Sequence, residues 1–119
     1  MAAFRLATKR VYDDPAESDG YRVLVDRLWP RGVSKERARL DEWLKELAPS
    51  TELRTWFHHD VGKWPEFRDR YRAELADEEA LWRPLVDRAR REQVTLLFGA
   101  HDLEHNQAVV LKELLEEHA

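Results

Sequence analysis

The sequence predicts an α/β fold: a small, mainly parallel open sheet of three or four strands with helices packed on it, in two layers or in a Rossmann-like three-layer arrangement. Two apolar runs, 21–25 and 94–98, have the composition of buried strands. Stretches with the apolar spacing of helices lie between and after them. Each run leads directly into a polar cluster, and the carboxyl ends of parallel strands share one edge of a sheet. We therefore expect the functional site at that edge, where open α/β sheets bind ligands.

Length and composition indicate one domain spanning residues 1–119. Hydrophobic residues make up 43% and charged residues 37%, with a net charge of only −4 and both signs interspersed. That balance argues against bulk attraction to nucleic acid or to a membrane surface. The chain has no cysteine, which excludes disulfides, zinc–thiolate sites and thiol catalysis. Without a long apolar run or the apolar region of a signal peptide, we expect a cytoplasmic protein.

The first part of the chain predicts two strands joined by an irregular crossover. Residues 4–8 are expected to form the first strand. Residues 14–20 have loop chemistry throughout, and the connection is too short for a helix. The second strand starts at Tyr21, and the chain turns at Pro30 and Gly32.

The middle of the chain predicts short helices. Ser34 is placed to cap one over residues 35–39, and Ser50 to cap one over residues 51–58. Between them, the apolar spacing within residues 40–47 fits a helix. A polar loop follows and continues to residue 62.

The last part of the chain predicts three helices and a strand. A helix is expected over 64–75, with a proline in its first turn. The next should begin near Leu81, because a proline inside a helix costs about 3 kcal/mol and Pro84 would then lie in the first turn. The strand 94–98 follows, and Asp102 is placed to cap the final helix. Its apolar face is formed by Ala108, Leu111, Leu114 and Leu115.

The first polar cluster follows the second strand. Arg27 and Arg31 can bind a carboxylate or a phosphate in bidentate fashion, or they can form surface ion pairs with the acids of this chain. Asp26 closes an apolar strand, and a buried carboxylate needs a partner or its pKa rises. It could orient the arginines, act as a base, or serve as a structural salt bridge; we favour orientation. Trp29 lies amid the cluster and is a candidate stacking surface rather than core.

The second polar cluster follows the last strand. His101 and His105 have i, i+4 spacing, which could suit a metal together with Asp102 or with a residue of 58–60. His101 precedes the helix and would not share its face, so we expect no metal. His105 and Asn106 are expected in the first turn of the helix, whose free N–H groups suit an anion. The structural alternatives are a loop-locking side chain for Asn106 and a half-buried imidazole for His105.

These patterns define the candidate site. Without cysteine or a well-placed serine, an enzyme would depend on acid–base chemistry, with arginines stabilising an anion. The candidate catalytic residues are Asp26 and His105. The candidate substrate-binding residues are Arg10, Arg27, Trp29, Arg31, Asp102 and Asn106. We expect no cofactor.

Several blocks of the chain resemble the domain-of-unknown-function 488 (DUF488) family, in its short YeaO-like branch. The matching blocks are 9–13, 19–32, 48–54, 71–75 and 94–98. The resemblance implies a small bacterial or archaeal cytoplasmic α/β protein and brings no established activity. It also favours an extended segment, rather than a helix, over residues 42–47, and we adopt that prediction.

One departure from the family pattern concerns the site. Short-branch members commonly read Asn-His-Ala where this chain has Asn106-Gln107-Ala108, and often have lysine at His101. A mechanism that uses that histidine is not available here unless His101 or His105 substitutes for it.

The sequence therefore predicts a protein that binds a small anionic metabolite, such as a nucleotide or a sugar phosphate, as a hydrolase, a transferase or a former enzyme. The alternative is a non-catalytic sensor or protein-interaction module. Nucleic-acid binding is the least favoured function, and a monomer or a homodimer is expected.

Overall fold

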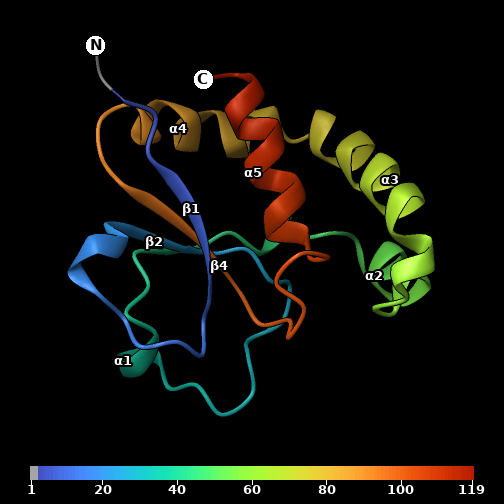
Figure 1. Ribbon diagram of the computed structural model, residues 1–119, viewed down its shortest axis with the longest axis horizontal. Helices are drawn as coiled ribbons and strands as arrows, with labels where there is room; N and C mark the ends of the chain where they lie inside the picture. The colour runs from blue at the N-terminus through green and yellow to red at the C-terminus, as the bar shows by residue number, and fades with distance from the viewer. Residues whose placement is uncertain (1–2) are drawn as a thin grey trace.

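A computed structural model describes residues 3–119 of the protein and confirms the predicted fold class (Figure 1). The strands form one parallel sheet in the order β1-β4-β2-β3. Their bounds are β1 Leu6–Arg10, β2 Tyr21–Leu24, β3 Glu42–Trp43 and β4 Val94–Phe98. The helices are α1 Lys35–Ala38, α2 Thr51–Phe57, α3 Trp64–Ala76, α4 Glu79–Ala89 and α5 Gln107–Glu117, with short 3-10 turns η1 Glu17–Asp19, η2 Lys45–Leu47 and η3 Val61–Lys63.

Strand β4 is the centre of the sheet. All of its residues are buried, and it pairs with β1 on one side and with β2 on the other. Residue 98, its last, lies opposite Arg10, and Leu97 lies opposite Leu24. The three strands therefore end at the same edge, and the chain segments that follow β2 and β4 meet there.

The two faces of the sheet are covered unequally. Val23 and Leu96 belong to a large core beneath helices α2 to α5. Their neighbours Leu24 and Leu97 face the opposite side, because side chains alternate along a strand. That side is covered by α1 and by the loop that precedes it. Figure 1 shows α3, α4 and α5 on one side of the sheet and α1 on the other.

Local signals in the sequence account for most of the helix starts. The Ser34 hydroxyl accepts the N–H of Arg37 at 3.0 Å, and the Ser50 hydroxyl accepts the N–H of Leu53 at 3.1 Å. Both serines are the predicted N-caps. The predicted apolar face of α5 is buried as expected.

Two strand predictions need correction. The first strand covers 6–10 rather than 4–8, because its pairing with β4 runs through to Phe98. Residues 42–47 are extended only at Glu42 and Trp43 and then form η2. The helix-like spacing in this segment arises because Leu44 and Leu47 reach the core from a strand end and a 3-10 turn.

Two predictions about helix ends were wrong. Helix α4 begins at Glu79, so Pro84 is an interior residue rather than part of the first turn. The early start lets Trp82 bury its ring and donate its indole N–H to the carbonyl of Leu75 at 2.8 Å. Helix α5 is capped by Asn106 instead of Asp102, because the segment 101–106 forms turns of its own before the helix begins.

None of the helices in the described part of the chain has the length and apolar character needed to cross a lipid bilayer.

Candidate functional site

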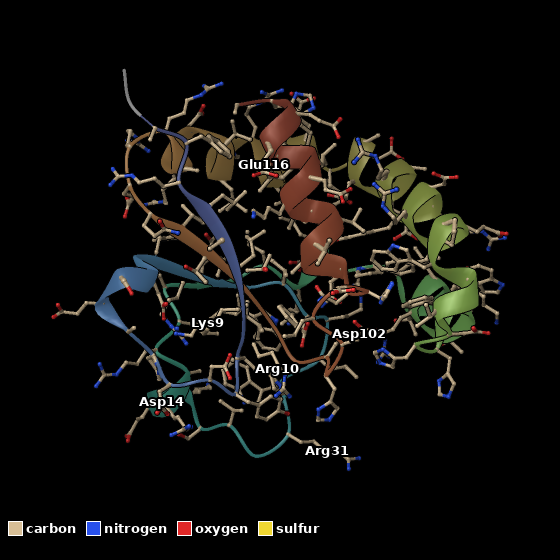
Figure 2. The ribbon with its side chains drawn as sticks, viewed as in Figure 1. Lys9, Arg10, Asp14, Arg31, Asp102 and Glu116 are labelled. Atoms are coloured by element: carbon tan, nitrogen blue, oxygen red, sulfur yellow. The ribbon has the colours of Figure 1, made fainter. Side chains whose placement is uncertain are left out.

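A cavity of about 710 Å³ opens at the carboxyl edge of the sheet. Its lining comes from four segments that are distant in sequence: Tyr12 after β1, the residues after β2, the residues between η2 and the first turn of α3, and the residues from the end of β4 to the start of α5. Figure 2 shows Arg10, Arg31 and Asp102 toward the end of the molecule where the strands finish, and Glu116 toward the opposite end. The volume lies in the range of small-molecule sites. The two predicted polar clusters are therefore brought together as expected, and we call this cavity the edge pocket.

Asp26 connects the segments that form the floor of the edge pocket. One carboxylate oxygen accepts the N–H of Gly99 at 2.9 Å, and the other accepts the side-chain amide of Gln107. The Asp26 carbonyl also accepts the indole N–H of Trp43 at 2.7 Å. These contacts tie the ends of β2 and β4 to the start of α5. Asp26 forms no hydrogen bond with Arg27 or Arg31, so its predicted role in orienting them was wrong.

Gly99 is required by this close approach. A Cβ atom at position 99 would lie 2.8 Å from the carboxylate oxygen of Asp26 and 3.9 Å from atoms of both Pro30 and Tyr12. A side chain there would push the strand ends apart or displace the carboxylate.

The environment of Asp26 changes its acidity. Burial raises the pKa of its carboxyl group to about 6, against the opposing effects of the Gly99 N–H, the Gln107 amide and the charge of Arg54. The sequence predicted such a rise for a buried carboxylate without a cationic partner. The carboxyl group of Asp26 therefore titrates closer to neutral pH than an exposed aspartate does.

Two of the predicted arginines brace the walls of the edge pocket. Arg27 donates to the carbonyls of Pro49 at 3.0 Å and Ala48 at 3.1 Å, which fastens the segment before α2. Arg10 lies beside the lining and donates to the carbonyl of Ala100 at 3.0 Å. Its guanidinium lies 4.9 Å from the centre of the Tyr12 ring. Their roles as ligand contacts stay predictions.

Two other arginines, Arg31 and Arg54, form no hydrogen bonds of this kind. Arg31 lies at the rim and points away from the body of the molecule (Figure 2). Arg54, on α2, lines the edge pocket as well. Neither guanidinium has a hydrogen-bond or salt-bridge partner among residues 3–119. Arg54 was missed by the sequence analysis, since it required knowing that α2 borders the site.

Asp102 and His105 form a local pair. One oxygen of Asp102 accepts the backbone N–H groups of Glu104 at 2.9 Å and His105 at 3.0 Å. The other lies 2.9 Å from Nδ1 of His105, whose ring packs edge-on against Trp64. The Glu104 N–H is the largest cause that lowers the pKa of Asp102, and His105 adds to it.

Asn106 is buried and has the structural role that the sequence analysis gave as an alternative, a side chain that locks the loop. Its amide donates to the carbonyl of Asp102 at 2.9 Å, and its oxygen accepts the N–H of Val109 at 3.2 Å. The side chain therefore both locks the loop and caps α5. His105 and Asn106 precede the helix instead of forming its first turn.

Trp29 and His59 also line the edge pocket. The indole N–H of Trp29 donates to the carbonyl of Val33 at 2.6 Å, and its ring meets Trp43 edge-on. His59 reaches the lining from the α2–α3 loop, whereas His58 does not. Both have a left-handed backbone, with φ of 42° and 56°, which is uncommon for residues other than glycine.

Across residues 3–119, no three or more His, Cys, Asp or Glu side chains gather in a way that could hold a metal ion.

The fold and the edge pocket define the class of protein: a single-sheet α/β domain with a ligand-sized cavity at the ends of parallel strands. Residues 5–119 match the family model described as "Inactive DUF488-N3 subclade", and the chain belongs to the DUF488 family.

Two bacterial proteins are similar to this chain over most of their length. The chain is 51% identical over 107 residues to the uncharacterized protein YeaO of Escherichia coli K12, covering 90% of this chain and 93% of the relative. It is 42% identical over 111 residues to the uncharacterized protein Rv3073c of Mycobacterium tuberculosis, covering 93% of each. No solved structure matches the chain significantly.

Proposed function

We propose that the protein binds a small anionic metabolite, bearing a phosphate or a carboxylate, in the edge pocket without converting it chemically. The observation that carries the proposal is Arg54, a guanidinium that lines the cavity and forms no salt bridge or hydrogen bond with the described residues, although its charge acts on Asp26 from a longer distance. Arginine presents donors in a planar fork that matches both kinds of anion. Arg31 at the rim offers a second cation of the same kind.

The acids of the edge pocket support an anionic ligand because their oxygens are already engaged. Asp26 accepts from Gly99 and Gln107, and Asp102 accepts from Glu104 and His105. The positive charge of Arg54 is therefore offered to a ligand more openly than the negative charge of either carboxylate. The raised pKa of Asp26 further reduces its charge near neutral pH.

Two observations favour binding over catalysis. The side-chain partner of Asp26 is the amide of Gln107, which does not titrate near neutral pH and so cannot act as an acid or a base as a histidine would. The family model that matches the chain is described as inactive. We infer a sensor or carrier of a free metabolite that works in the cytoplasm as a monomer or a homodimer, without a nucleic-acid or membrane partner.

A hydrolase or transferase is the second candidate. It is favoured by the contact between Asp102 and Nδ1 of His105, which leaves Nε2 free to act as a base. Prolonged incubation with phosphate esters, with product release followed in the unaltered protein and in His105→Gln, separates the two. Turnover that His105→Gln abolishes would favour the enzyme, and its absence favours binding alone.

The binding proposal is tested by thermal unfolding in the presence of inorganic phosphate, methyl phosphate and acetate. We expect inorganic phosphate and methyl phosphate to raise the melting temperature, since a ligand that binds only the folded state stabilises that state. The effect should largely disappear in Arg54→Gln. Arg83→Gln is the matched control, because Arg83 is a surface arginine on α4 that is already paired with Glu79.

Two results would contradict the proposal. One is the absence of any anion-dependent shift in the unaltered protein. The other is a shift that Arg54→Gln and Arg83→Gln retain to the same extent.

A further inference from the structure

We propose that the anion bound in the edge pocket carries a flat apolar body, as in an aryl phosphate or an aryl carboxylate. This inference rests on the proposed function and names the class of its ligand. It follows from the way polar and apolar groups are divided within the cavity.

Apolar side chains from several segments line the edge pocket. Trp29 and Pro30 line it from the segment after β2, and Tyr12 from the segment after β1. Pro30 and Tyr12 both lie close to Gly99 at the floor, as the 3.9 Å distances from a Cβ at that glycine show.

Phe57 and Phe67 line the cavity from α2 and α3, and their rings stack with centres 4.3 Å apart. Aromatic and proline walls of this kind suit a flat apolar group.

The polar groups at the floor have little left to offer a polyhydroxylated ligand. Both oxygens of Asp26 already accept hydrogen bonds, and both ends of the Asn106 amide are engaged with the backbone. The amide nitrogen of Gln107 is used by Asp26. Hydroxyl groups buried here would lose their bonds to water without full replacement, which is unfavourable. An apolar group has no hydrogen bonds to water to lose when it is buried at the same place.

Leu28 adds a third observation. It is 60% exposed, although it is a large apolar side chain that lines the edge pocket. A ligand with an apolar body would cover it and remove apolar surface from water. Leu103, 62% exposed in the β4–α5 loop, lies outside the lining and provides a matched control.

The test is calorimetric titration with methyl phosphate and phenyl phosphate, which share the anion and differ in the body. Burial of a phenyl ring predicts that phenyl phosphate binds at least about tenfold more tightly than methyl phosphate. Leu28→Ser should weaken phenyl phosphate severalfold and leave methyl phosphate unchanged. Leu103→Ser should change neither, and Arg54→Gln should weaken both.

The outcomes separate this inference from the proposed function. Equal affinity for the two esters overturns the inference and leaves anion binding intact, whereas no binding of either ester overturns both. A phenyl preference to which Leu28→Ser and Leu103→Ser respond alike also overturns it, because the ring would then lie elsewhere. Both leucines are exposed, and melting temperatures without ligand verify that the variants fold.

Discussion

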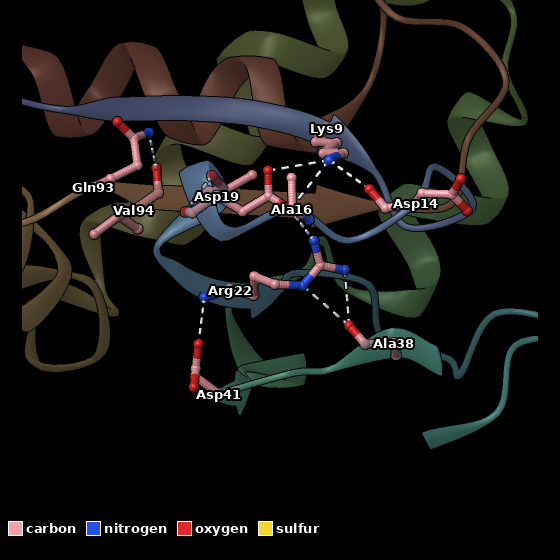
Figure 3. A network of polar contacts seen from close by, with 10 residues as sticks. Lys9, Asp14, Ala16, Asp19, Arg22, Ala38, Asp41, Gln93 and Val94 are labelled. Atoms are coloured by element: carbon pink, nitrogen blue, oxygen red, sulfur yellow. Dashed lines mark hydrogen bonds and ion pairs between the residues drawn. The ribbon is translucent and has the colours of Figure 1, made fainter. Parts of the chain in front are cut away.

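Two clusters of charged side chains in this protein contrast in how their charges are satisfied. The first lies on the side of the sheet that α1 covers, where Lys9, Asp19 and Arg22 form an ion network (Figure 3). Lys9 contacts Asp19 at 3.1 Å and the carbonyl of Asp14 at 2.8 Å. Arg22 pairs with Asp19 and donates to the carbonyl of Ala38 at 2.8 and 3.1 Å. Every charge in this network has a partner within the chain.

The edge pocket is the second cluster, and its charges are not matched. The hydrogen bonds of Asp26 come from uncharged donors, and Arg54, whose charge acts on Asp26 from a longer distance, forms no salt bridge among the residues described. Both clusters are built from the same residue types, so composition does not distinguish them. The difference teaches that a candidate binding site can be sought where the fold supplies no close partner for a charged side chain.

The largest expected effect is in the first cluster. Asp19→Ala should lower the free energy of unfolding by about 3–5 kcal/mol, because it leaves Arg22 buried without its partner. Arg54→Gln should change it by no more than about 0.5 kcal/mol, since no salt bridge or hydrogen bond is lost and only the longer-range attraction between Arg54 and Asp26 is removed. Urea unfolding measures both, and comparable losses in the two variants would remove the contrast.

The next effect concerns the close approach at the floor of the edge pocket. Gly99→Ala should destabilise the protein by about 1–3 kcal/mol, because its Cβ would lie 2.8 Å from Asp26. Gly62→Ala is the control, since its nearest contact is the side-chain carboxylate of Asp60 at 3.2 Å. Urea unfolding of both variants measures the difference. If Gly99→Ala is as stable as the unaltered protein, the strand ends are less tightly joined than described.

The two aspartates should respond to pH with opposite sign. Burial tends to raise the pKa of Asp19, but the N–H of Ala16 and the Lys9 and Arg22 side chains outweigh it and lower that pKa. Asp19 therefore contributes stability that is present above about pH 4 and lost as the pH falls through its folded-state pKa. The pKa of Asp26 is raised to about 6, so the folded state holds its proton more tightly than the unfolded state. The stability that the protonated Asp26 contributes is therefore present below about pH 4 and is lost as the pH rises through about 6.

Asp26→Asn tests this sign. The substitution should remove a penalty on the order of 3 kcal/mol at pH 7 and flatten the stability profile between pH 4 and 7. The oxygen of the introduced amide still accepts from Gly99, and the Gln107 amide can turn to accept from the new NH₂ group. Urea midpoints across this pH range give the result. A variant that is less stable than the original at pH 7 would contradict a destabilising charge at Asp26.

The smallest effect on stability should accompany the loss of the Asp102–His105 contact. Both side chains are partly exposed, and solvent-screened pairs of this kind contribute little to stability. His105→Gln should therefore unfold at nearly the same urea concentration as the original protein. A loss above about 2 kcal/mol would indicate that His105 is part of the core instead of the edge pocket.

The sequence predicted what local patterns determine. The buried strand 94–98, the caps at Ser34 and Ser50 and the apolar face of α5 each depend on neighbouring residues, and all were confirmed. The shared edge followed from the rule that parallel strands end together.

The errors came from tertiary context. Pro84 lies inside α4 because the burial of Trp82 extends that helix toward its start. Leu44 and Leu47 mimic a helix because a strand end and a 3-10 turn both reach the same core.

The site itself was only partly predictable. Asp26 and His105 both line the edge pocket, since each lies in a segment that leaves the carboxyl end of a strand; their roles in a site stay predictions. Arg54 and Gln107 were not predicted, because the one lies on a helix whose position depends on packing and the other is defined by a contact 81 residues away.

The most direct test of the account is a phosphate titration followed by NMR, with the Nε–H signals of Arg22 and Arg54 observed in the same spectra. We predict that the Arg54 signal shifts in a saturable manner, together with backbone amides of the edge-pocket loops, whereas the Arg22 signal stays in place. An Arg54 signal that does not move, or one that moves no more than that of Arg22, would contradict the claim that the unpaired cation of the edge pocket is an anion site.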